Sequence, residues 1–336
     1  MSTVTSTTTG TKAVSTGARV GVGRVANRLS GAGLLLFLIL AGGVFSTLSP
    51  YFLSVNNFVN ILLSVAMIGM VATGMTLVLV GGGLDLSVGS TIGLAGSIEG
   101  VLMVQSGMPW YVGVAAGLAT GLVVGTLNAT IISYLRINPI ITTLATMSIV
   151  RGAAYIYTEG NSIYVPSQQA QWLGTGRLLG TPVPVIIMAI CFVGVWAVSR
   201  YTVFGRYIYA IGGNPVASRL AGIRVNRYLN IVFVFSGLVS GLAGVVMVGL
   251  TASAVPAAGT GYELDVITAV LLGGTSLSGG EGSVWGTLVG VLIIGVINNG
   301  MTLLNVPPYW QIAAKGALLL MAVSLDALRK RTRANV

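Results

Sequence analysis

The segment RYTVFGRYIYAIGGNPVASRLAGIRVNRY, residues 200–228, is the one large basic loop between two long apolar stretches of this chain. Asn214 is a typical N-cap residue, Pro215 suits the first position of a helix, and Gly222 can end a helix in a left-handed conformation. These signals predict a helix over residues 215–221. Because helix nucleation is costly, seven residues do not hold a helix in water alone, and this one has to pack against something.

The predicted helix carries a small apolar patch. Val216 and Leu220 are four residues apart on one helix face, with Ile223 just beyond. Such a patch fits a groove in a partner protein, with Arg219 beside an acidic rim of that groove. It equally fits an amphipathic turn at the membrane interface, anchored by arginines and by Tyr207, Tyr209 and Tyr228. The pattern alone leaves both interpretations open.

The composition surrounding this loop is that of a membrane protein. Apolar residues make up 54% of the 336 residues, charged residues 7%, and the mean hydropathy is +0.91. These values are far too hydrophobic for a soluble domain and indicate a polytopic membrane protein. The single cysteine, Cys191, and the absence of histidine exclude an intramolecular disulfide, a Cys/His zinc site and a Ser-His-Asp triad.

Ten apolar runs are near the roughly 20 residues of helix that cross a hydrocarbon core of about 30 Å. We expect an all-α fold with spans at residues 30–48, 58–82, 88–106, 109–133, 139–158, 184–200, 228–250, 264–278, 283–303 and 308–328. Ten crossings return the chain to its starting side, so both termini are expected in the cytoplasm. The external loop 159–183 is long enough to form a small helix or a partner contact.

The positive-inside rule supports this orientation, because cytoplasmic loops are enriched in Lys and Arg. Of the 17 basic residues, only Arg177 lies plainly outside. The 14 on the cytoplasmic side are Lys12, Arg19, Arg24, Arg28, Arg136, Arg200, Arg206, Arg219, Arg224, Arg227, Arg329, Lys330, Arg331 and Arg333. Since these residues flank apolar spans, the net charge of +10 does not indicate nucleic acid binding.

The domain organisation follows from the same pattern. Residues 1–28 are rich in Ser, Thr and Gly and predict a disordered basic cytoplasmic tail. Residues 29–328 form the transmembrane domain, which includes the cytoplasmic segment 204–227. Residues 329–336 form a second basic tail.

Two predicted cytoplasmic turns resemble one another: LVLVGGGLDLSVGSTIGLAG at 77–96 and AVLLGGTSLSGGEGSVWGTLVG at 269–290. They indicate a duplicated unit, as transporters often contain, or simply Gly and Ser in tight interhelical turns. Asp85 is placed to cap the helix that follows it, with a pathway role as the alternative. The glycines would let both turns flex at an inner gate, whose candidate residues are Gly82, Asp85, Gly273, Gly274 and Glu281.

Three charged residues are predicted at membrane depth: Glu99, Arg151 and Lys315. Charges there are costly and usually face a cavity or one another. We expect Glu99 to pair with Arg151 or Lys315 near the outward mouth of a solute pathway. The alternative for the two cations is snorkelling to the outer interface.

Four stretches together resemble the ribose-type permease subunits of bacterial carbohydrate ABC importers, within the branched-chain amino acid/ribose-type inner-membrane permease family. They cover most of the chain from about residue 34 to 328. In order they are GMTLVLVGGGLDLSVGS (74–90), RINPIITTLATMSIVRGAAYIYTEG (136–160), FGRYIYAIGGNPVASRLAGIRV (204–225) and TAVLLGGTSLSGGEGSVWGTLVG (268–290).

The resemblance implies a permease of the vitamin B12-type, type II-like architecture in the bacterial inner membrane. It implies a homo- or heterodimer with a second permease, cytoplasmic ATPases that use ATP and Mg, and a periplasmic or lipid-anchored sugar-binding protein. The chain itself would bind no cofactor. A short coupling helix would dock on the ATPase, and the matching residues are Gly213, Asn214, Pro215, Val216, Ala217, Arg219, Leu220, Gly222 and Ile223.

Two other function classes remain as alternatives. No GxxxxGK[ST] phosphate loop occurs, so ATP hydrolysis by that route has to come from another subunit. An ion-coupled secondary transporter would work without other subunits, and it would need discontinuous helices around buried ion ligands. Few acidic residues at membrane depth, chiefly Glu99, could serve as such ligands, so this alternative has weak support. A membrane enzyme is weaker still, because no nucleophile–base pair or metal cluster is recognisable.

Overall fold

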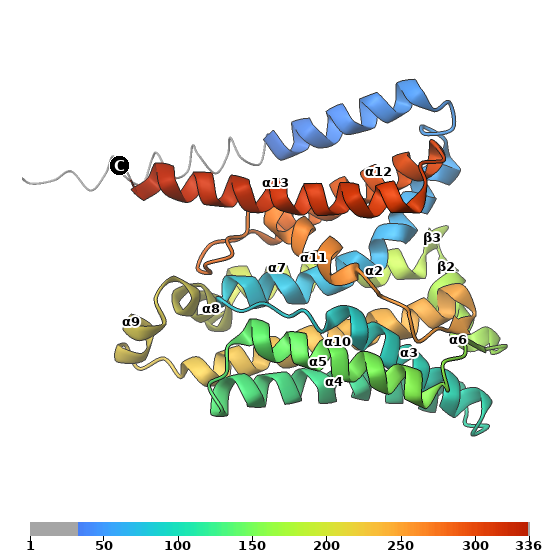
Figure 1. Ribbon diagram of the computed structural model, residues 1–336, viewed down its shortest axis with the longest axis horizontal. Coiled ribbons are helices and arrows are strands. Elements are labelled where there is room, and N and C mark those ends of the chain that lie inside the picture. The colour runs from blue at the N-terminus through green and yellow to red at the C-terminus, as the bar shows by residue number, and fades with distance from the viewer. Residues whose placement is uncertain (1–32, 335–336) are drawn as a thin grey trace, which may run out of the picture.

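A computed structural model describes residues 33–334, which form a bundle of helices with two short antiparallel strand pairs (Figure 1). Seven of its helices are long and apolar enough to cross a membrane. They are α2 (Val55–Val80), α4 (Trp110–Tyr134), α5 (Pro139–Tyr157), α7 (Val183–Tyr201), α10 (Val225–Thr251), α12 (Val284–Leu303) and α13 (Pro308–Ala334). The prediction of a polytopic all-α membrane protein is confirmed at this level.

The remaining described helices are shorter. They are an unlabelled helix at Gly33–Leu48, α3 (Val88–Val104), α6 (Gln168–Thr175), α8 (Val203–Gly213), α9 (Pro215–Leu220) and α11 (Tyr262–Leu272). Strand β1 (Ile163–Tyr164) pairs antiparallel with β4 (Ser253–Ala254), and β2 (Arg177–Leu178) pairs antiparallel with β3 (Thr181–Pro182). The predicted external loop 159–183 therefore contains a small helix, α6, which was one of its two expected forms.

Three of the ten predicted spans correspond to helices that are shorter than a membrane crossing. Of the run 30–48, the described residues Gly33–Leu48 are helical; the run 88–106 is helical over the 17 residues of α3, and 264–278 over only the 11 residues of α11. The prediction for α11 was wrong at its C-terminal end, because Gly273 and Gly274 end the helix and Gly274 has a φ of +89°. The preceding segment is not helical either, with positive φ at Ala252, Gly259 and Gly261.

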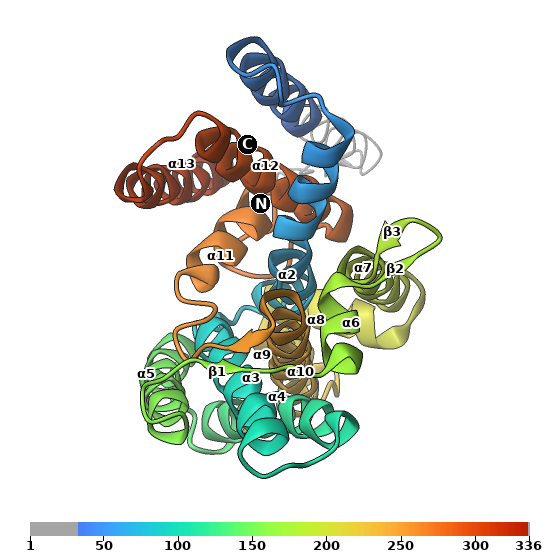
Figure 2. The same cartoon turned by 90° about the vertical axis from the view of Figure 1, so that its right-hand side faces the viewer.

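Helices α2 and α10 form the centre of the bundle. In the end-on view of Figure 2, α3, α4 and α5 lie on one side of them and α11, α12 and α13 on the other. Within its apolar window α2 is 83% buried, whereas α13 is 6% buried. The outer helices therefore leave most of their apolar surface for lipid or for another subunit.

Small residues allow a close helix crossing in the core, between α4 and α10. Gly121 of α4 faces Gly241 of α10 so closely that a Cβ on Gly121 would lie 2.9 Å from the Gly241 Cα. Gly125 and Gly237 meet in the same way, with 2.7 Å from a Cβ on Gly237 to the Gly125 Cα. Such small-xxx-small spacing brings two backbones into contact, which is how transmembrane helices pack without a hydrophobic driving force.

The two ends of the bundle differ. Figure 1 shows α8, α9 and the C-terminus of the chain at one end, and α6 with the β2–β3 hairpin at the other. Arg219 lies on α9 and Arg177 on β2, so the basic loop 200–228 and the one plainly external arginine of the predicted topology lie at opposite ends. This separation agrees with the predicted topology, in which these two parts of the chain face opposite sides of a membrane.

Candidate functional site

Helix α9 forms almost as its sequence predicts. The Asn214 side-chain oxygen accepts hydrogen bonds from the backbone N–H groups of Val216 (3.1 Å) and Ala217 (2.9 Å). The helix ends at Leu220, with Ala221 as the C-cap, so the predicted end was one residue too long. Gly222 has a φ of +82°, as the left-handed ending requires.

The apolar patch of α9 is exposed. Val216 is 64% exposed and Leu220 is 85% exposed, while Ile223 is half-buried. Ser218, on the opposite face, is buried. Only one face of this short helix is therefore packed against the rest of the chain, and the face that carries Val216 and Leu220 is open to a partner.

Aromatic and polar contacts attach the neighbouring helix α8 to the bundle. Ile208 and Ile211 are buried, and the Tyr209 hydroxyl donates a hydrogen bond to the Gly282 carbonyl (3.1 Å). The rings of Tyr207 and Tyr228 stack edge to face with their centroids 5.2 Å apart. The tyrosines that the interface-anchor interpretation assigned to lipid thus contact other parts of the chain.

Five glycines join α8 to both Gly-rich turns, and we call them the glycine junction: Gly82, Gly212, Gly213, Gly279 and Gly280. The Gly280 N–H donates to the Val80 carbonyl (2.8 Å), which links the second turn to the end of α2. A Cβ on Gly279 would lie 2.9 Å from the Gly82 Cα and 3.0 Å from the Gly212 Cα. The backbone leading into α9 therefore touches both predicted gate turns directly.

The two turns begin with the same helix ending. At the end of α2, the N–H groups of residues 81–83 donate to the carbonyls of Leu77, Leu79 and Val78. At the end of α11, residues 273–275 donate to the corresponding carbonyls of Ala269, Leu271 and Val270. In both cases a glycine with positive φ, Gly82 or Gly274, forms the left-handed position of a Schellman motif. Because this ending is common, the duplicated unit stays a prediction.

Beyond these endings the turns differ in their acidic residues. Asp85 is buried, and its carboxylate accepts from the Ser87 N–H (3.0 Å), the Ser87 hydroxyl (2.6 Å) and the Ser236 hydroxyl of α10 (2.8 Å). Ser87, not Asp85, is the N-cap residue of α3, so Asp85 acts on the helix start from two residues upstream. Glu281 is exposed and closes its own turn through its backbone carbonyl, which accepts from the Ser276 N–H (3.0 Å).

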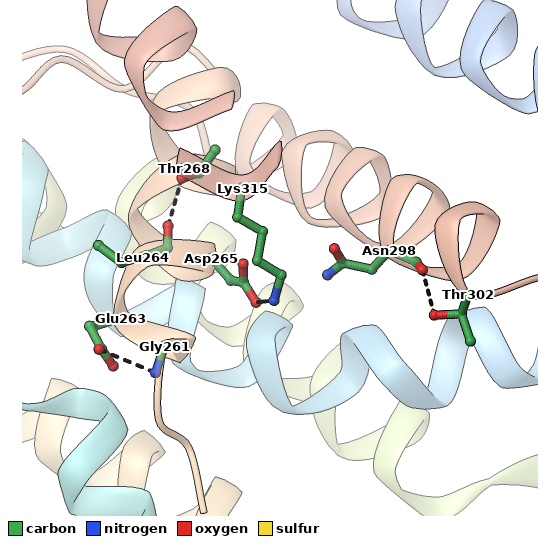
Figure 3. A network of polar contacts seen from close by, with 8 residues as sticks. All are labelled: Gly261, Glu263, Leu264, Asp265, Thr268, Asn298, Thr302 and Lys315. Carbon is green, nitrogen blue, oxygen red and sulfur yellow. Dashed lines mark hydrogen bonds and ion pairs between the residues drawn. The ribbon is translucent and has the colours of Figure 1, made fainter. Parts of the chain in front are cut away.

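The predicted pairing of the membrane charges was wrong. Lys315 of α13 reaches Asp265 of α11, with 2.6 Å between its Nζ and the carboxylate oxygen (Figure 3). Arg151 of α5 donates to the carbonyls of Pro256 (2.7 Å) and Ala258 (2.8 Å), in the irregular segment before α11. Both cations therefore find partners inside the bundle, which also argues against snorkelling.

Glu99 is fully buried in α3, and both of its carboxylate oxygens lack a hydrogen-bond partner within residues 33–334. Neither cation pairs with Glu99: Arg151 donates to the two carbonyls, and Lys315 donates to Asp265. Asp265 is not among the residues singled out from the sequence, since it stands near the start of a predicted span, where an acidic residue is usual. Only the tertiary contact between α11 and α13 identifies its partner.

The starts of α3 and α11 meet near Arg151. Gly89, in the first turn of α3, approaches the carbonyl of Gly259 and the carboxylate of Glu263, leaving no room for a side chain. Glu263 accepts from the Gly261 N–H (3.2 Å) at the start of α11. Short helices that meet through irregular backbone are the arrangement that forms polar solute sites in the interior of many transporters.

Long apolar helices around a central pair, with a capped helix exposed at one end, define the chain as a multi-pass membrane transport component. A family model described as "Branched-chain amino acid transport system / permease component" matches residues 57–323, so the chain belongs to this family. The resemblance read from the four stretches is thereby confirmed. No solved structure matches the chain.

Sequence comparison with individual proteins shows which members of this family the chain is similar to. It is 44% identical over 296 residues to the ribose import permease protein RbsC of Escherichia coli K12, covering 87% of this chain and 92% of that protein. The RbsC protein of Bacillus subtilis is also 44% identical, with 88% and 90% covered. The L-arabinose ABC transporter permease protein AraH of Azospirillum brasilense is 40% identical over 319 residues, with 94% and 92% covered. These relatives are transport permeases, which confirms the predicted permease function.

Proposed function

We propose that this chain is the membrane-spanning subunit of an ATP-driven importer for a pentose, in the bacterial inner membrane. The relatives named for ribose and L-arabinose transport support the substrate class, because both sugars are neutral aldopentoses of the same size. The end that carries α8 and α9 faces the cytoplasm, as the positive-inside rule requires for its arginines. The seven long helices cross the membrane. The shorter helices Gly33–Leu48, α3 and α11 cross it in part, and irregular backbone next to α3 and α11 spans the remaining depth.

The partners are those of an importer. A cytoplasmic ATPase uses ATP and Mg, a second permease subunit completes the pathway, and an external binding protein delivers the sugar. The observation that carries the coupling role is α9 itself. Its exposed pair, Val216 and Leu220, stands on a helix whose other face is packed and whose preceding residues, Gly212 and Gly213, touch both Gly-rich turns. A partner that moves α9 would therefore act on the end of α2 and on the turn that follows α11 through backbone contacts.

The coupling role is tested by placing a charge on the exposed patch. We expect V216D/L220D to insert into the membrane normally but to lose co-purification with the ATPase, because two carboxylates replace the apolar contact. The matched control is Leu179→Asp, which changes a fully exposed leucine at the opposite end of the bundle. Retention of the ATPase by V216D/L220D would refute the coupling role, and loss by both variants would point to a general folding defect.

The transport function is tested by reconstitution into proteoliposomes. The chain together with its ATPase and binding protein should take up labelled ribose or arabinose only when ATP is present, and unlabelled pentose should compete better than hexose. The alternative, an ion-coupled secondary transporter, has one structural feature in its favour, the meeting of two short helices at Gly89 and Gly259. Uptake by the chain alone along an ion gradient would establish that alternative.

A further inference from the structure

A cavity of about 760 Å³ lies beside the coupling helix, between the α4–α5 connection and the start of α10. It is an open cleft and not an enclosed cavity, because the arginines that line it are exposed. Four arginines from three parts of the chain line it: Arg136 after α4, Arg219 on α9, and Arg224 and Arg227 at the start of α10.

The charge in this cavity is uncompensated. Its lining includes Ser133 and Asn226 but neither aspartate nor glutamate. All four arginines are exposed, and the one ion pair found among the described residues, Lys315 with Asp265, is elsewhere. Arg136 also has a φ of +55°, a left-handed conformation that is uncommon for arginine and that turns the chain between α4 and α5. Four guanidinium groups around one cavity call for an anion with several acceptor oxygens.

The surface next to the cavity indicates where that anion comes from. Tyr134 and Leu135, which precede Arg136, are 75% and 66% exposed, and Ile137, which follows it, is 40% exposed. Helices α4 and α5 are among the less buried long helices, with 39% and 28% of their apolar windows buried. Apolar side chains beside a ring of arginines at a helix end match the boundary between acyl chains and headgroups.

We infer that this cavity binds the phosphate headgroup of an anionic phospholipid from the cytoplasmic leaflet. The headgroup would bridge Arg136 to Arg224 and Arg227, and so tie the segment between α9 and α10 to the end of α4. The inference rests on the proposed function in one respect only, which is that this end of the bundle faces the cytoplasm. Lipid binding is measured without transport, so its failure and the failure of the proposed function are separable.

The test uses the purified full-length chain in nanodiscs of phosphatidylcholine with or without phosphatidylglycerol, followed by native mass spectrometry of retained lipid. We expect selective retention of phosphatidylglycerol by the wild type. R136Q/R224Q/R227Q should lower that retention, by roughly fivefold for each charge removed. Glutamine keeps a long polar side chain at each position. R200Q/R206Q, which removes two arginines of α7 and α8 outside the cavity, should retain the lipid.

Three outcomes would overturn the inference. The first is equal retention of phosphatidylglycerol by the wild type and the triple variant. The second is displacement of the lipid by inorganic phosphate alone, which would indicate a site for a free anion. The third is loss of the ATPase from the triple variant with lipid retention unchanged, which would indicate an acidic partner segment. If the triple variant does not insert, R136Q and R224Q are measured singly, and retention as in the wild type by both would again contradict lipid binding.

Discussion

Lys315 and Asp265 bring opposite charges into a bundle in which neither is stable alone. Asp265 is 1% exposed and Lys315 is 29% exposed, so the carboxylate depends on the ammonium group for most of its compensation. One Asp265 oxygen accepts from Lys315, and the other has no partner among the described residues. Removing the lysine would leave a buried carboxylate with an uncompensated charge, which is the costly way to break such a pair.

We therefore predict that Lys315→Met destabilises the protein by about 2 kcal/mol, less than for a fully buried pair because Lys315 is partly exposed. The double variant D265N/K315M should regain most of this loss, since it removes both charges together. Thermal unfolding in detergent measures both effects. Equal destabilisation by the single and double variants would show that Lys315 stabilises the bundle by packing and not by compensating the charge of Asp265.

At the scale of elements, α9 is joined to the bundle by backbone. Gly212 stands where a Cβ would collide with the carbonyl of Val80 and the N–H of Gly280, and neither of these main-chain groups can move aside as a side chain would. Gly213, the next residue, has nothing within 4 Å of the same position. The backbones of both glycines lie against the second turn, but only at Gly212 would an added side chain collide with it.

This difference gives a matched pair of variants. We expect Gly212→Ala to push α8 away from the second turn and to reduce ATP-dependent uptake strongly, while ATPase co-purification through α9 is kept. Gly213→Ala should leave both uptake and co-purification near wild-type values. The measurements are uptake in proteoliposomes and ATPase recovery on affinity purification. A Gly212→Ala variant with normal uptake would remove the glycine junction from the coupling route.

The sequence predicts local features of these elements well and tertiary ones poorly. Asn214, Pro215 and Gly222 determine α9 to within one residue because caps act over one turn of helix. The predicted span 264–278 extended past the end of α11 and overlapped the predicted Gly-rich turn 269–290, because hydropathy does not locate a helix end within an apolar run. The partner of Lys315 was missed for a different reason: hydropathy gives the depth of a charge but not which helix faces it.

At the scale of the whole molecule, the basic loop and the predicted external hairpin lie at opposite ends of the bundle, which predicts its orientation in the membrane. The arginines on α9 and before α10 lie at the end that also holds the C-terminus of α13, and the β2–β3 hairpin lies at the other (Figure 1). An inward position for α9 is necessary for contact with a cytoplasmic ATPase. The chain is well suited to a direct test, because Cys191 is its only cysteine.

In a Cys191→Ser background, we predict opposite labelling of two exposed leucines by a membrane-impermeant maleimide. Leu179→Cys, at the tip of the β2–β3 hairpin, should react in intact spheroplasts, and Leu220→Cys should react only after the membrane is permeabilised. Both side chains are more than four-fifths exposed, so burial does not account for a difference. Labelling of Leu220→Cys from outside would show that the bundle has the opposite orientation. Helix α9 could then not contact a cytoplasmic ATPase.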